Sequence, residues 1–138
     1  RLRSAIDLAA LRGVAIDLAI PERSDHAVMD WAMHAHLAYF PLDRMRCYLT
    51  PGPFDHSKLM TVDGQWCAIG SPNWDVRSLR LNFELLLECY DEETVRKLDS
   101  AIDEKIAKAT MLTPEDLTGR PLAARLRDAS ARMLLPYL

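Results

Sequence analysis

The stretch Asp55-His56-Ser57-Lys58-Leu59-Met60-Thr61-Val62-Asp63 carries the most specific pattern in this sequence. Residues 58–62 are predicted to form a strand, and His56 and Lys58, two residues apart, project from the same face of such a chain because side chains alternate with a period of two. An imidazole and an ammonium group then lie together. A phosphate oxyanion placed there would meet a nucleophile or acid beside a fixed positive charge.

A polar loop, Gly70-Ser71-Pro72-Asn73, follows this stretch after a second predicted strand. Its backbone N–H groups and the Asn73 amide are suited to holding oxyanions. Taken by itself, a histidine is more often a structural residue, and Lys58 could be a solvated surface charge. The string HxKxxxxD followed by GSxN is much more specific than either part.

These two motifs resemble those of the phospholipase D superfamily. The resemblance continues through residues 73–84, which are similar to the NxDxRSxxxNxE stretch of bacterial cardiolipin synthases. Weaker likeness at residues 12–14, 24–25 and 112–121 extends the resemblance over nearly the whole chain. The part of those enzymes that the chain resembles is their second half. The resemblance implies a phospholipase D-like α/β domain.

The resemblance also implies roles for the motif residues. In the family, one histidine attacks phosphorus to form a phosphohistidine and another protonates the departing alcohol. His56 is thus a candidate nucleophile or acid, with Lys58, Ser71 and Asn73 as phosphate ligands. Glu84 matches a carboxylate that accepts a hydrogen bond from the imidazole, with a capping or ion-pair role at a strand start as the alternative.

Asp63 belongs to the signature and is therefore a candidate catalytic residue, but its place beside Gly64 equally suits a structural role in a turn.

Only one HxK is present in the 138 residues, whereas the family's active sites use two. The partner motif is expected either from a homodimer mate across a two-fold axis or from a missing N-terminal half. The chain opens at Arg1 within a helical pattern, which favours the second alternative. We therefore expect the C-terminal half of a longer protein, N-terminally truncated, with His56 as the acid/base partner.

The predicted function is phosphatidyl transfer between phospholipid alcohols, with a phosphatidylglycerol-like substrate and no cofactor. The alternatives are a homodimeric nuclease or phosphodiesterase, or a catalytically incomplete fragment. A net charge of −3 disfavours nucleic acid as a partner. Metal ligation is not expected because the sequence has no CxxC or HExxH spacing. The parent protein is expected at the bacterial cytoplasmic membrane surface, and this chain alone to be soluble.

The predicted fold is α/β, a mixed sheet flanked by helices, in one domain spanning residues 1–138. Ser24 or Asp25 is the expected cap of the second helix. Residues 110–138 are predicted as a helical tail, whose arginines either contact anionic lipid or form a solvated face on a helix packed against the domain. The expected helices cover residues 2–11, 24–39, 92–109 and 121–135, and the expected strands cover residues 14–20, 45–50, 58–62, 66–69 and 83–90.

Overall fold

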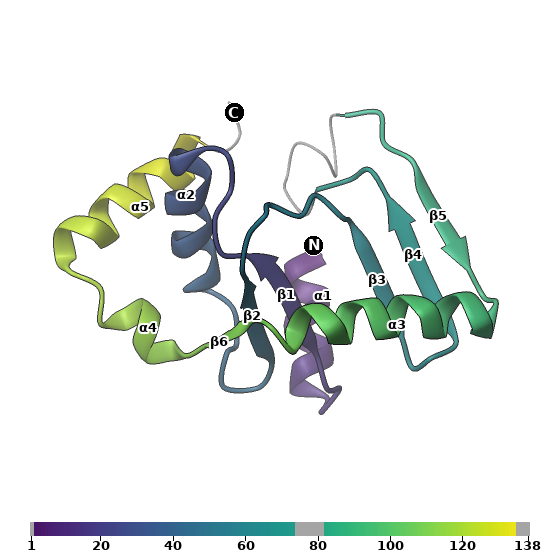
Figure 1. The fold of residues 1–138 in the computed structure, drawn as a ribbon. Helices are drawn as coiled ribbons and strands as arrows, with labels where there is room; N and C mark the ends of the chain where they lie inside the picture. The colour runs from purple at the N-terminus through teal and green to yellow at the C-terminus, as the bar shows by residue number, and fades with distance from the viewer. Residues whose placement is uncertain (1, 74–81, 135–138) are drawn as a thin grey trace. The chain divides into compact units, whose positions relative to one another are not determined.

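The computed structural model describes residues 2–73 and 82–134 (Figure 1). The described part of the chain contains five helices and six strands, which confirms the predicted α/β class. Contacts within the chain divide it into two compact units, Arg1–Phe54 with Lys108–Leu138, and Asp55–Ala107. These are called the first and second units below.

The first unit is built on a three-stranded sheet with β2 at its centre. Strand β2 pairs parallel with β1 and antiparallel with β6. Helix α2 supplies the crossover that a parallel pair requires. The core of the unit gathers around Cys47, which is fully buried. Its elements are α1 (Leu2–Leu11), β1 (Asp17–Pro21), α2 (Ala27–Leu37), β2 (Arg46–Thr50), β6 (Thr110–Leu112), α4 (Pro114–Thr118) and α5 (Leu122–Leu134).

Helices α2 and α5 lie side by side in this unit (Figure 1). The guanidinium carbon of Arg127 lies 4.5 Å from the centroid of the Trp31 ring. Asp128, only 2% exposed, accepts hydrogen bonds from Arg120 Nη2 at 2.9 Å and Arg127 Nη2 at 2.7 Å. Arg132 stacks over Tyr39 in the same way. The terminal helix is packed on the domain, as one of the two predicted alternatives has it, and three of the four arginines of its region contact protein groups although the Arg127 side chain is 42% exposed.

The start of α2 differs from the prediction. The helix begins at Ala27, with His26 in the N-cap position and without a side-chain cap hydrogen bond, so the prediction of Ser24 or Asp25 as the cap is wrong. Asp30 in the first turn reaches back instead, and its Oδ1 accepts the Ser24 N–H at 2.7 Å. A carboxylate in the first turn of a helix is favoured by the helix dipole.

The second unit is an antiparallel sheet covered by one helix. Strands β3 (Leu59–Val62), β4 (Trp66–Gly70) and β5 (Leu86–Cys89) are neighbours in that order, and helix α3 (Glu92–Ile106) packs against β3 and β4 (Figure 1). Cys67 on β4 and Val95 on α3 are fully buried. Asp91 caps the helix by accepting the Thr94 N–H at 2.9 Å. The unit therefore buries one face of its sheet under α3.

Residues 63–65 join β3 to β4, whose last paired residues are Val62 and Trp66. Asp63 and Gly64 have φ angles of 51° and 66°, both in the left-handed region, and Gln65 N–H donates to the Val62 carbonyl at 3.0 Å. Positive φ at both central positions defines a type I′ turn, whose twist matches that of the flanking strands. The predicted Asp63-Gly64 hairpin is confirmed.

Three predicted elements are shorter or differently formed than the sequence suggested. The strand predicted over 14–20 begins only at Asp17, where pairing with β2 begins. The strand predicted over 83–90 is confined to β5, because β4 offers partners only from Cys67 to Gly70. Residues Thr110–Leu112, predicted as the start of a helical tail, form strand β6 on the edge of β2.

Candidate active site

His56 and Lys58 meet in the extended segment immediately before β3. The Lys58 Nζ contacts His56 Nδ1 and also donates to the His56 carbonyl oxygen at 2.7 Å. Gly70 N–H donates to the Lys58 carbonyl at 3.0 Å, which ties the start of this segment to the end of β4. The structure thus places the ammonium against the imidazole, with His56 exposed and Lys58 half-buried.

The Lys58 ammonium lies in a partly desolvated, acidic setting. Burial lowers the pKa of Lys58 below its usual value, and the negative charges of Asp55 and Glu84 oppose that shift. The Lys58 ammonium is thus partly desolvated while two carboxylates favour its charged form. Such a charge stabilises an anion more strongly than one in bulk solvent.

Ser71 and Glu84 form the second cluster of the site, where the loop after β4 meets the chain leading into β5. Ser71 Oγ donates to Glu84 Oε2 at 2.5 Å and accepts the Leu85 N–H at 3.0 Å. Asn82 Nδ2 donates to the other carboxylate oxygen of Glu84 at 3.3 Å. The Glu84 carboxylate is therefore held at both oxygens, and its charge acts on Lys58.

Gly70 permits this close approach of the two segments. A Cβ at position 70 would lie 2.3 Å from the Leu85 carbonyl oxygen, which is backbone and cannot move aside easily. We predict that Gly70→Ala separates β4 from the residues before β5 and lowers the free energy of unfolding by about 1–3 kcal/mol. Urea denaturation measures the loss. Gly52→Ala, where the added Cβ meets nothing within 4 Å, is the control; equal stability of the two variants would contradict the prediction.

The remaining predicted site residues are placed differently. Asn73 is exposed in the same loop as Ser71. Asp63 lies in the turn at the other end of β3, five residues beyond Lys58, and roughly 16 Å away at about 3.3 Å per residue of strand. Of the stretch 73–84 that resembles the cardiolipin synthases, residues 74–81 lie outside the described part of the chain.

Two residues that were not predicted as site residues hold this segment: Asp55, which lies within it, and Lys105 on α3. Asp55 Oδ1 accepts hydrogen bonds from the Ser57 N–H at 2.9 Å and the Ser57 hydroxyl at 2.6 Å. Asp55 Oδ2 accepts a hydrogen bond from Lys105 on α3. The Asp-x-Ser spacing is a recognisable signal for such a turn, whereas nothing local in the sequence indicates Lys105.

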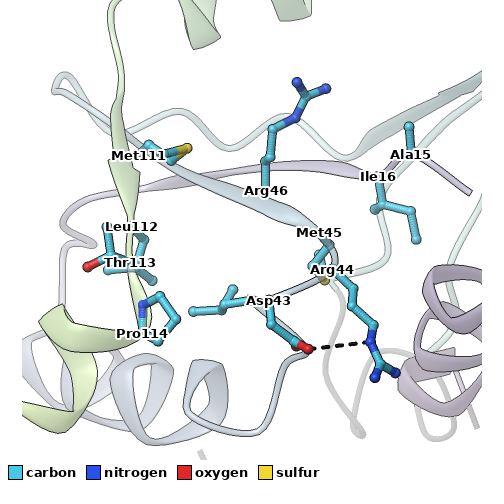
Figure 2. Close-up of a pocket in the computed structure, with 11 residues that line it drawn as sticks. Ala15, Ile16, Asp43, Arg44, Met45, Arg46, Met111, Leu112, Thr113 and Pro114 are labelled. Atoms are coloured by element: carbon cyan, nitrogen blue, oxygen red, sulfur yellow. Dashed lines mark ion pairs between the residues drawn. The ribbon is translucent and has the colours of Figure 1, made fainter. Parts of the chain in front are cut away.

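A separate hollow lies in the first unit. It has a volume of about 490 Å³ and lies beside Met45, Met111 and Pro114, with an Asp43–Arg44 ion pair of 3.3 Å at its rim (Figure 2). None of its lining residues belongs to the predicted site. Among residues 2–73 and 82–134, we find no cluster of three side chains suited to holding a metal ion, and no helix that is both long and apolar enough to cross a bilayer.

An α/β unit that carries His56 and Lys58 just before β3 and Ser71 just after β4 of one antiparallel sheet agrees with the phospholipase D-like class, although Asp63 lies at the far end of β3.

Comparison with known proteins identifies the family within this class. Residues 1–106 match the family model described as "Cardiolipin synthase, PLD-like domain". The chain belongs to this family. It is 36% identical over 137 residues to the cardiolipin synthase of Listeria monocytogenes, and 33% identical over 135 residues to cardiolipin synthase 1 of Staphylococcus epidermidis. These alignments cover 99% and 98% of the chain but only 28% of each relative.

Proposed function

We propose that this chain supplies one of two half-sites of a phosphatidyltransferase that resembles cardiolipin synthase. The observation that carries the proposal is the contact of the Lys58 ammonium with the His56 imidazole, beside a carboxylate held by Ser71. Sites of this kind stabilise a transferring phosphoryl group by charge and position. The second HxKxxxxD motif would come from another part of a longer protein or from a second copy of the chain.

The chemistry has two balanced steps. A histidine nitrogen attacks the phosphorus of one phospholipid, and the bond to the headgroup alcohol breaks as a second histidine gives that alcohol a proton. The hydroxyl of another phospholipid then gives its proton to the second histidine and attacks the phosphorus of the phosphohistidine, whose P–N bond breaks and frees the first histidine. The phosphatidyl group has moved from one alcohol to another, with a phosphatidylglycerol-like lipid as the natural donor and acceptor at a membrane surface.

In this scheme His56 acts as the acid and base, and Lys58 and Asn73 hold phosphoryl oxygens. A serine hydroxyl has one proton to donate, and that of Ser71 goes to Glu84. We therefore assign Ser71 an indirect role, the positioning of Glu84, whose negative charge supports Lys58 and the imidazole. Asp63 is assigned to the turn, where its φ of 51° suits a structural role.

A chimera tests the proposed function. Residues 1–138 would replace the aligned segment of the Listeria monocytogenes cardiolipin synthase, which provides the remaining part of the polypeptide. The chimera is expected to convert phosphatidylglycerol in vesicles to cardiolipin with release of glycerol. A folded chimera that makes no cardiolipin, under conditions in which the unmodified relative does, would contradict the proposal.

The lowered pKa of Lys58 gives a pH prediction. The ammonium form holds phosphate, so kcat/KM of the chimera should fall as the pH rises through the pKa of Lys58, below the roughly 10.4 of an ordinary lysine. A guanidinium stays protonated above pH 12 or so, so Lys58→Arg should remove this alkaline limb from the profile. If the Lys58→Arg variant shows the same alkaline fall in kcat/KM, that fall belongs to the titration of another group.

A further inference from the structure

The segment that carries His56 lies outside the regular sheet. Residues 54–58 form no strand, and β3 begins only at Leu59. Lys58 is fixed through its carbonyl, which accepts the Gly70 N–H. The peptides on either side of His56 need another constraint if the imidazole is to be held for catalysis.

Asp55 supplies that constraint with both carboxylate oxygens. Oδ1 accepts the Ser57 N–H and the Ser57 hydroxyl, which closes a turn of the chain around His56. Oδ2 accepts a hydrogen bond from Lys105, 50 residues further along and in the last turn of α3. The side chains of the pair are only 35% and 39% exposed. One carboxylate therefore joins the His56 segment to the helix that covers the sheet.

We propose that Asp55 and Lys105 form a positioning pair, which fixes the backbone around His56 and so directs the imidazole and the Lys58 ammonium toward one phosphate. The inference rests on the proposed function of His56. Neither residue is assigned to the chemistry itself. Misplacing a reacting group by about 1 Å costs on the order of 100-fold in rate, so a positioning contact of this kind has a measurable effect.

The charge of the pair is stable at neutral pH. The hydrogen bond from Lys105, followed by those from Ser57, holds the pKa of Asp55 well below its usual value. A carboxylate whose pKa is lowered by folding stabilises the protein at pH values above its pKa in the unfolded chain, which is near 4. This stabilisation is lost as the pH falls toward the pKa of the folded state. The Asp55 carboxylate therefore stays ionised at neutral pH.

The test combines three variants with one matched control. Asp55→Ala removes the turn and the ion pair, Lys105→Met removes only the ion pair, and Lys105→Arg retains a donor and a charge. Lys97→Met is the control, because Lys97 pairs with Glu93 on the same helix at 2.7 Å and is 74% exposed. Two quantities are measured: the carbon–proton NMR signal of the His56 ring in this chain, and kcat and KM of the chimera.

Asp55→Ala is expected to shift and broaden the His56 ring signal and to lower kcat by about 10- to 100-fold, with KM changed by less than about threefold. Lys105→Met should change the ring signal and kcat in the same direction but less. Lys105→Arg should have nearly the ring signal and kcat of the unsubstituted protein, and Lys97→Met should leave both unchanged. An unchanged ring signal and kcat in folded Asp55→Ala would overturn the inference. Failure of the proposed function has a different signature, since His56→Ala would then retain transfer activity whatever the Asp55 variants do.

Discussion

His56→Ala is expected to lower cardiolipin formation by the chimera about 10³-fold, within the range measured for loss of a positioned acid or base. The imidazole contacts the Lys58 ammonium and is exposed, so its removal takes away the proton donor and acceptor without opening a cavity in the core. KM should change little, because Lys58 and Asn73 still hold the phosphate. Product formation from radiolabelled phosphatidylglycerol measures the loss.

His26→Ala is the matched control for this prediction. His26 is exposed, lies in the first unit at the start of α2, and its side chain makes no cap hydrogen bond. Its substitution should leave the rate within about twofold, a barrier change of less than half a kcal/mol. Equal rates for the His56 and His26 variants would show that the HxK motif does not take part in the transfer.

The second large effect concerns stability and lies in the first unit. Asp128→Ala is expected to lower the free energy of unfolding by about 3 kcal/mol, because removal of one partner from a buried ion pair leaves the other charge unpaired. Asp128 is 2% exposed and pairs with both Arg120 and Arg127. The side chain of Arg127 is itself 42% exposed, which keeps the expected loss at the lower end of the range for such pairs.

Asp43→Asn is the control, since Asp43 pairs with Arg44 in the same unit while 68% exposed. Exposed pairs contribute about 0–1 kcal/mol, so this variant should unfold at nearly the same urea concentration as the parent chain. A loss below about 1 kcal/mol in Asp128→Ala would mean that the two arginines are satisfied by solvent and do not depend on the carboxylate.

The parts of the structure that were predicted well from the sequence are determined by residues close together along the chain. The β3–β4 hairpin followed from Asp63-Gly64, because the two residues favour the backbone angles that its turn needs. The closeness of His56 and Lys58 followed from the two-residue repeat of an extended chain, even though β3 itself begins one residue later. The candidate site could thus be located from one short motif and its loop.

The parts that were not predicted from the sequence depend on contacts between residues far apart along the chain. Strand β6 is three residues long and exists because β2 offers it an edge. Before α2, Asp30 Oδ1 accepts the Ser24 N–H and Ser24 Oγ accepts the His26 N–H, an arrangement that the usual capping preference does not predict. Lys105 reaches Asp55 across 50 residues of sequence, so no local pattern signals the contact.

In the proposed function, this chain provides half of an active site. Hydrolysis of a chromogenic phosphodiester by the chain, measured over a wide range of protein concentration beside His56→Ala and with ultracentrifugation to give the oligomeric state, tests it most directly. The monomeric chain is expected to be inactive, and any His56-dependent activity per chain is expected to rise with concentration as two copies associate. Constant, His56-dependent activity per chain from a sample shown to be monomeric would contradict it.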